Sequence, residues 1–141
     1  MASSILSPEN IRFNASVDSK EEAIRLTGEL LVERGYVAPA YIDTMLEREK
    51  LTSTYMGNYV AIPHGTEEGK QNVKESGIVI VQVPDGVDFG DGNIVKLLIG
   101  IAGKGDEHLE ILSKIALVVA EEDNVQKIVQ AESAEEIMKF F

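Results

Sequence analysis

Residues 78–83 read Ile-Val-Ile-Val-Gln-Val, and residues 94–101 read Ile-Val-Lys-Leu-Leu-Ile-Gly-Ile. Successive side chains of a strand point to opposite faces, so runs that are apolar at both odd and even positions indicate strands covered on both sides. These two runs therefore predict the central strands of a sheet with helices on both faces. Asp85-Gly86 and Asp91-Gly92 predict turns between the two strands.

Before residue 78 the sequence predicts two helices and two short strands, preceded by a short extended piece near residues 11–13. Ser19 and Glu22 can form a capping box at the start of the first helix, and Gly35 can end it. Pro39 suits the first turn of the second helix. This second helix is expected at residues 39–50, and the two strands at residues 52–56 and 58–62.

After residue 101 the sequence predicts three helices. Asp106 can cap a long one, and Asp123 with Gln126 and Ser133 with Glu136 resemble the caps of two short ones. The long helix carries Leu109, Leu112, Ile115, Ala116 and Val119 among its apolar residues. We therefore expect one α/β domain over residues 1–141, a sandwich whose mixed, mostly parallel central sheet is flanked by helices on both faces.

Composition excludes several classes of function. The 141 residues carry a formal net charge of -11, and none of them is cysteine. Strong acidity without a basic stripe argues against nucleic-acid binding. The absence of cysteine excludes disulfides and thiolate catalysis and suits a cytoplasmic protein. The sequence has no signal-peptide pattern and no apolar run near the ~20 residues that a membrane span needs.

The stretch from Tyr59 to Thr66 is an apolar strand pattern that runs into Pro63-His64-Gly65. Such a strand brings an imidazole to the rim of the sheet, where glycine allows the backbone to turn away. The chain has 2 histidines, His64 and His108. A histidine at a strand end more often has a packing role than a reactive one, so the pattern alone leaves both roles of His64 open.

Helical periodicity adds three residues to this picture. In the long helix His108 heads an apolar stripe, because at ~100° per residue it lines up with Ile115. In the second helix Glu49 points toward the buried face, where a carboxylate requires hydrogen bonds or a paired charge, and Arg48 lies on the flank. The buried face of that helix is predicted to contain Tyr41, Ile42, Met45 and Leu46.

Motifs for other chemistries lack essential residues. Residues 100–105, Gly-Ile-Ala-Gly-Lys-Gly, resemble a phosphate loop but do not have the Walker spacing. The acidic stretch at residues 85–91 lacks the ligand order of an EF-hand. His64 and His108 do not have the short spacing typical of a metal site. We expect neither a cofactor nor a metal.

A longer pattern connects these residues to a known family. Glu49 is followed by six residues, Met56-Gly57, two residues, and then the run Val60 to Gly65. This pattern resembles the phosphorylation-site motif of the fructose/mannitol class of enzyme IIA in the bacterial phosphotransferase system. Residues 48–55, Arg-Glu-Lys-Leu-Thr-Ser-Thr-Tyr, are similar to the mannitol-specific branch. The resemblance covers nearly the whole chain and includes Glu107-His108-Leu109.

The resemblance implies a phosphoryl carrier with a phosphohistidine intermediate. His64 would accept the phosphoryl group from the histidine phosphocarrier protein and pass it to a cysteine of the sugar-specific IIB component. Arg48 would stabilise charge on the phosphoryl group, and His108 would orient His64 and its phosphate. Contact with the membrane would be only indirect, through the transporter. We expect Met56, Gly57 and Gly65 to line the docking surface.

Two alternatives remain open at this point. One is the same chemistry in a fructose-type or regulatory nitrogen-type IIA. The other is a non-catalytic module that uses the fold only to bind a partner. The presence of both histidines and Arg48 argues against the second alternative. We expect a free-standing protein.

Overall fold

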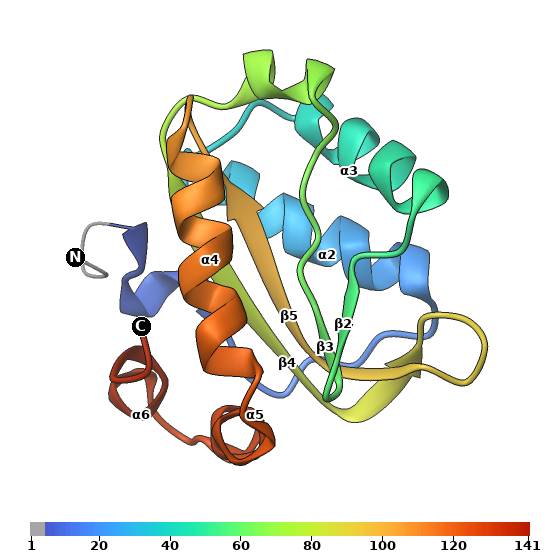
Figure 1. Cartoon of the computed structure of the whole chain (residues 1–141), viewed down its shortest axis with the longest axis vertical. Helices are drawn as coiled ribbons and strands as arrows, with labels where there is room; N and C mark the ends of the chain where they lie inside the picture. Colours follow the sequence, from blue (N-terminus) through green and yellow to red (C-terminus); the bar gives the residue numbers. More distant parts are fainter. Residues whose placement is uncertain (1–4) are drawn as a thin grey trace.

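The structure is a computed structural model that describes residues 5–141. At its centre is a five-stranded sheet with the order β1-β4-β5-β3-β2. The two apolar runs form its long central strands, β4 (Gly77–Asp88) and β5 (Ile94–Ala102), as predicted. The shorter strands are β1 (Ile11–Arg12), β2 (Tyr55–Gly57) and β3 (Val60–Ala61). Figure 1 labels β2, β3, β4 and β5.

The sheet is mixed, as expected. The pairs β1–β4 and β3–β5 are parallel, and the pairs β4–β5 and β2–β3 are antiparallel. The longest ladder is the antiparallel one between β4 and β5, because a short turn joins these strands and reverses the chain. Parallel and antiparallel pairs therefore occur in equal number, so the sheet is mixed as expected but parallel pairs do not outnumber antiparallel ones.

One turn prediction was wrong. Asp85-Gly86 does not reverse the chain but lies inside β4, where the register with β5 shifts between Gln82 and Val87. Gly86 has φ 80°, a conformation that glycine adopts at little cost in such an irregularity. Pairing resumes at Val87, so the reversal occurs only at Asp91-Gly92, where both residues have positive φ.

Helices cover both faces of the sheet, which confirms the predicted α/β sandwich (Figure 1). Alternation along β4 divides the core: Val79 and Val81 pack on one face, and Ile78 and Ile80 on the other. The first face is covered by α2 (Lys20–Glu33) and α3 (Ala40–Leu51). The second is covered by α4 (Glu107–Val119) and α5 (Glu122–Gln130), with α6 (Ala134–Met138) and the 3-10 helix η1 (Pro8–Asn10) beside them.

Two of the four N-caps that the sequence predicted are formed in the structure. Ser19 caps α2 by accepting from the Glu22 N–H, and Ser133 forms a full capping box with Glu136. Asp106 occupies the N-cap position of α4 but makes no side-chain cap bond. Asp123 lies inside the first turn of α5, so its predicted capping role was wrong.

The long helix α4 buries Ile111, Ile115 and Val119 against the sheet. Leu109, which belongs to the same apolar pattern, is 67% exposed. Its position is one residue from His108 and on the side of α4 that turns away from the sheet. None of the helices in residues 5–141 is both long enough and apolar enough to cross a membrane.

Candidate functional site

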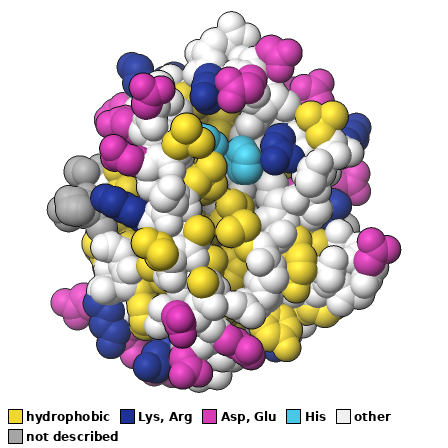
Figure 2. Space-filling model, viewed as in Figure 1, with side chains coloured by type: hydrophobic (Ala, Val, Ile, Leu, Met, Phe, Trp, Pro, Cys, Tyr) yellow, Lys and Arg dark blue, Asp and Glu magenta, His cyan; other side chains and the backbone are white. Residues whose placement is uncertain are grey.

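The two histidines and Arg48 reach one pocket from three elements. His64 follows β3, His108 lies in the first turn of α4, and Arg48 lies in the last turn of α3. The pocket has a volume of about 450 Å³. In the space-filling view the histidines lie at the surface beside a basic side chain, with hydrophobic side chains around them (Figure 2). The wall of the pocket also includes Tyr41, Leu51, Gly65, Lys70, Gly103 and Leu109.

The backbone around His64 is held by β5. The Ile101 N–H donates to the Pro63 carbonyl at 3.0 Å, so pairing with β5 continues beyond the two residues of β3. The Nδ1 atom of His64 lies 2.8 Å from the Ile62 carbonyl oxygen. A carbonyl oxygen only accepts, so Nδ1 carries the ring hydrogen of the neutral imidazole. The lone pair is therefore at Nε2.

Burial of the imidazole lowers the pKa of His64 below its ordinary value of 6.5. The charge of Arg48 lowers this pKa further, whereas the Ile62 carbonyl and the Glu49 charge act in the opposite direction. Because the net shift is downward, His64 is neutral near pH 7. A neutral imidazole with a free Nε2 lone pair is a nucleophile.

His108 faces His64 across the pocket, with ring centroids 5.1 Å apart and planes tilted by 57°. Its pKa is lowered to about 4, first by burial, then by the charge that His64 carries when it is protonated, and then by the charge of Lys70. His108 is therefore a neutral hydrogen-bonding group near pH 7. A Cβ atom at Gly103 would collide with the main chain of His108, so glycine at this position allows α4 to begin directly against the end of β5.

Arg48 and Glu49 point in different directions from the end of α3. Arg48 donates from Nη1 to the Thr52 carbonyl at 2.7 Å and borders the pocket. Glu49 is only 6% exposed, as its helical phase predicted. Its carboxylate accepts from the Thr54 N–H and hydroxyl group, and Lys20 Nζ lies 3.5 Å from it. Glu49 thus ties α3 to the following loop and to α2.

Some pocket residues were not singled out in the sequence. Lys70, in the 3-10 helix η2 (Glu68–Asn72), lines the pocket and pairs with Glu67 at 3.4 Å. Leu51 and Leu109 border it and are 74% and 67% exposed. Lys70, Leu51 and Leu109 come from three separate elements, so no local sequence pattern indicated that they line the same pocket. Of the three residues expected to line a docking surface, Gly65 lines this pocket, whereas Met56 and Gly57 do not.

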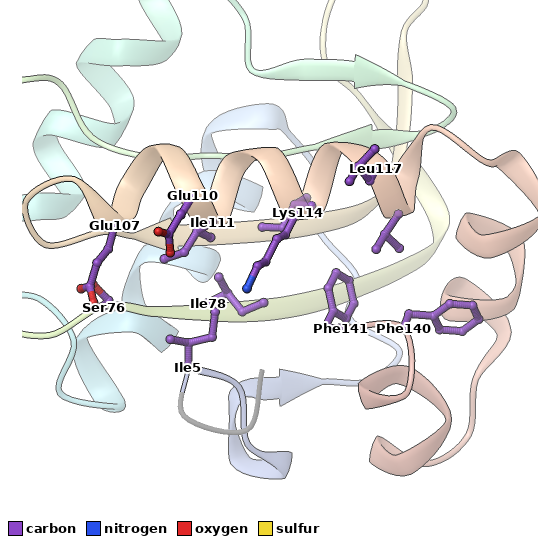
Figure 3. A pocket seen from close by; sticks show the side chains of 12 residues that line it. Ile5, Ser76, Ile78, Glu107, Glu110, Ile111, Lys114, Leu117, Phe140 and Phe141 are labelled. Carbon is purple, nitrogen blue, oxygen red and sulfur yellow. The ribbon is translucent and has the colours of Figure 1, made fainter. Parts of the chain in front are cut away.

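A second pocket of about 490 Å³ lies on the other side of α4. Figure 3 shows it between α4, Ile5 and the C-terminal Phe140 and Phe141. It is mainly apolar and contains neither histidine. Within residues 5–141, no group of three or more His, Cys, Asp or Glu side chains is arranged to hold a metal ion. Both histidines line the first pocket, which we call the histidine pocket.

Comparison with known proteins agrees with this geometry. The family model for the phosphoenolpyruvate-dependent sugar phosphotransferase system, EIIA 2, matches residues 4–141. A mannitol-specific phosphotransferase enzyme IIA component from Geobacillus stearothermophilus is 65% identical over 138 residues, 98% of this chain and 95% of the relative.

Two solved structures have the same fold. The crystal structure of IIA mannitol from Escherichia coli superposes with a TM-score of 0.89 at 41% identity, covering 96% of this chain and 97% of that one. A complex of enzyme IIAMTL and phosphorylated enzyme IIBMTL from the same organism gives a TM-score of 0.90 at 40% identity, covering 96% and 95%. These matches confirm the resemblance inferred from residues 49–65. The chain belongs to the EIIA 2 family of the phosphoenolpyruvate-dependent sugar phosphotransferase system.

Proposed function

We propose that this protein is a mannitol-specific IIA component that carries a phosphoryl group on Nε2 of His64. The observation that supports this most directly is the 2.8 Å contact between His64 Nδ1 and the Ile62 carbonyl. It leaves Nε2 free in the neutral ring. In the proposed step the Nε2 lone pair forms a bond to phosphorus, while the nitrogen–phosphorus bond of the donor phosphohistidine breaks and releases the donor's imidazole.

Arg48 and His108 are proposed to assist this step. Phosphoryl transfer depends on in-line positioning and on stabilisation of charge at the equatorial oxygens. A guanidinium group suits those oxygens, and Arg48 borders the pocket. His108, neutral because its pKa is about 4, is proposed to donate a hydrogen bond to the phosphoryl group. Two neutral rings in contact create no repulsion before the dianionic group arrives.

The proposed donor is the histidine phosphocarrier protein, and the proposed acceptor is a cysteine of the IIB component. A structure of a relative in complex with phosphorylated IIBMTL supports the acceptor. The mannitol-specific names of the relatives support the sugar. We propose that residues 1–141 act as one domain in the cytoplasm and reach the membrane only through the transporter.

The first experiment tests the phosphoryl step. The protein is incubated with phosphoenolpyruvate, enzyme I and the histidine phosphocarrier protein, and intact mass is measured before and after acid treatment. We expect one acid-labile phosphate on the wild type, none on His64→Ala, and slower labelling of folded His108→Ala. An unlabelled wild type, or full labelling of His64→Ala, would refute the proposal.

A second experiment tests the sugar. Phosphorylated protein is mixed in turn with a mannitol-type and a fructose-type IIB, and transfer to each is followed by rapid quenching. We expect faster transfer to the mannitol-type IIB. Preference for the fructose-type partner would assign the same chemistry to another branch, and transfer to neither would favour a regulatory IIA.

A further inference from the structure

We propose that Tyr41 positions His64 for phosphoryl acceptance by fixing, through its hydroxyl group, the peptide that follows the histidine. This inference rests on the proposed function. It assigns a role in phosphoryl transfer to a residue that does not itself react with the phosphoryl group. Tyr41 makes its contribution through the main chain, so we describe it as a positioning residue rather than a catalytic one.

The hydroxyl group of Tyr41 makes two hydrogen bonds, one buried and one partly buried. It donates to the Ile101 carbonyl at 2.9 Å and accepts from the Gly65 N–H at 2.9 Å. The side chain is only 2% exposed, so water does not compete for these partners. Burial raises the pKa of Tyr41, and the hydroxyl group therefore keeps the proton that it donates.

Both peptide groups beside His64 are thereby fixed to one residue of β5. On the N-terminal side the Pro63 carbonyl accepts directly from the Ile101 N–H at 3.0 Å. On the C-terminal side the Gly65 N–H reaches the Ile101 carbonyl through the Tyr41 hydroxyl group. The imidazole lies between these two attachments, so its main chain can neither slide nor rotate without breaking one of them.

The same strand end also places the opposite ring. β5 ends at Ala102, and Gly103 then packs directly against the main chain of His108. Ile101 is thus close in sequence to the segment that positions His108 while it anchors the segment that carries His64. Tyr41 therefore helps to hold the distance between the two imidazoles, and loss of its hydroxyl group should loosen one side of that arrangement.

Removal of the hydroxyl group leaves the ring contacts in place. A Cβ atom added at Gly65 would lie 2.6 Å from Tyr41 Cε1, which shows how closely the ring packs on this segment. In Tyr41→Phe that packing persists, but the Gly65 N–H and the Ile101 carbonyl lose their shared partner. We therefore expect a folded protein in which the His64 segment is less well positioned.

The test is the rate of phosphoryl transfer from the phosphorylated histidine phosphocarrier protein to Tyr41→Phe. Because a displacement of about 1 Å can slow a positioned reaction roughly 100-fold, we expect kcat to fall roughly 10- to 100-fold. The KM for the phosphocarrier should stay within about twofold, since the docking surface is unchanged. An unchanged kcat, or a change in KM alone, would overturn the proposal.

Tyr36→Phe is the matched control. Its hydroxyl group also has a protein partner, accepting from Asn10 Nδ2 at 2.8 Å, but Tyr36 does not line the histidine pocket. We expect wild-type kcat and KM for this variant. An equal loss of kcat in both variants would mean a general effect of removing a hydroxyl group, and would also overturn the proposal.

Hydrogen exchange of the Gly65 amide provides a measurement that needs no substitution. In the wild type we expect this amide to be protected, and in Tyr41→Phe to exchange faster, while Tyr36→Phe leaves it unchanged. A freely exchanging Gly65 amide in the wild type would contradict the inference even if Tyr41→Phe did not fold. A wild type that accepts no phosphate would instead refute the proposed function, because the exchange result is independent of transfer.

Discussion

The imidazole rings of His64 and His108 face each other with their centroids 5.1 Å apart, and the pKa of each is lowered by burial. Both rings are therefore neutral near pH 7, and the positive charges of Arg48, which lowers the pKa of His64, and of Lys70, which lowers that of His108, favour this state further. Permanent positive charge comes from the arginine and the lysine, and the imidazoles supply a lone pair and a hydrogen-bond donor. This division of roles suits a site that receives a dianion and then releases it.

The first prediction concerns the titration of His64. Since burial lowers its pKa, we expect the midpoint of its ring titration below 6.5. Protonation removes the Nε2 lone pair, so phosphoryl acceptance should be half-maximal at that midpoint, below pH 6.5, and should rise to a plateau at higher pH. NMR of ring-labelled protein gives the midpoint, and rapid-quench rates give the profile. A midpoint at or above 6.5 would contradict the burial argument.

The second prediction concerns stability and His108. With a folded pKa of about 4 and an ordinary value of 6.5, the folded chain binds fewer protons at His108 than the unfolded chain does within that window. The contribution of neutral His108 to the free energy of unfolding is therefore complete above pH 6.5 and is lost as the pH falls toward 4. Allowing for solvent screening at a half-buried group, we expect this loss to be about 1 kcal/mol.

The comparison that isolates this effect is His108→Gln. Urea unfolding of both proteins at about pH 7 and about pH 5 gives the change in the free energy of unfolding. All carboxylates are shared, so between these two pH values the wild type should lose more stability than His108→Gln, by about half of the full amount given above. Equal losses in the two proteins would show that His108 titrates alike in the folded and unfolded chains.

The third prediction concerns Arg48. Arg48→Lys keeps the positive charge but replaces the planar fork, and with it the 2.7 Å bond to the Thr52 carbonyl. We expect the rate of phosphoryl transfer to fall roughly 100-fold, the lower end of the cost of losing one preorganised donor, because lysine keeps the charge. Arg25→Lys, on the exposed side of α2, is the control and should transfer at the wild-type rate. Equal rates for the two variants would remove Arg48 from the proposed step.

The fourth prediction concerns Glu49 and is about stability rather than transfer. Glu49→Ala leaves the Thr54 N–H and hydroxyl group without their acceptor and removes the ion pair of Lys20. We expect the free energy of unfolding to fall by about 3 kcal/mol. Glu47→Ala, an exposed position on the same helix, should change it by no more than about 0.5 kcal/mol. Urea unfolding measures both, and similar values would contradict a scaffolding role.

The sequence by itself determined the features that depend on neighbouring residues. The two apolar runs form β4 and β5, because a strand with both faces covered must be apolar at successive positions. Ser19 and Ser133 cap their helices through bonds that span three residues. The inward position of Glu49 followed from helical phase, and the motif ending at Gly65 identified the family.

Other features were decided only by tertiary structure. Asp85-Gly86 has the composition of a turn, but pairing with β5 keeps it inside a strand. Helical phase placed His108 at the head of an apolar stripe, yet only the junction of β5, Gly103 and α4 brings its ring against His64. Helical phase predicted that Tyr41 lies on the buried face of its helix, but it did not predict the two hydrogen-bond partners of the hydroxyl group. Local periodicity specifies which face of an element is buried, but the atoms that meet there belong to segments far apart in the chain, and only packing brings them together.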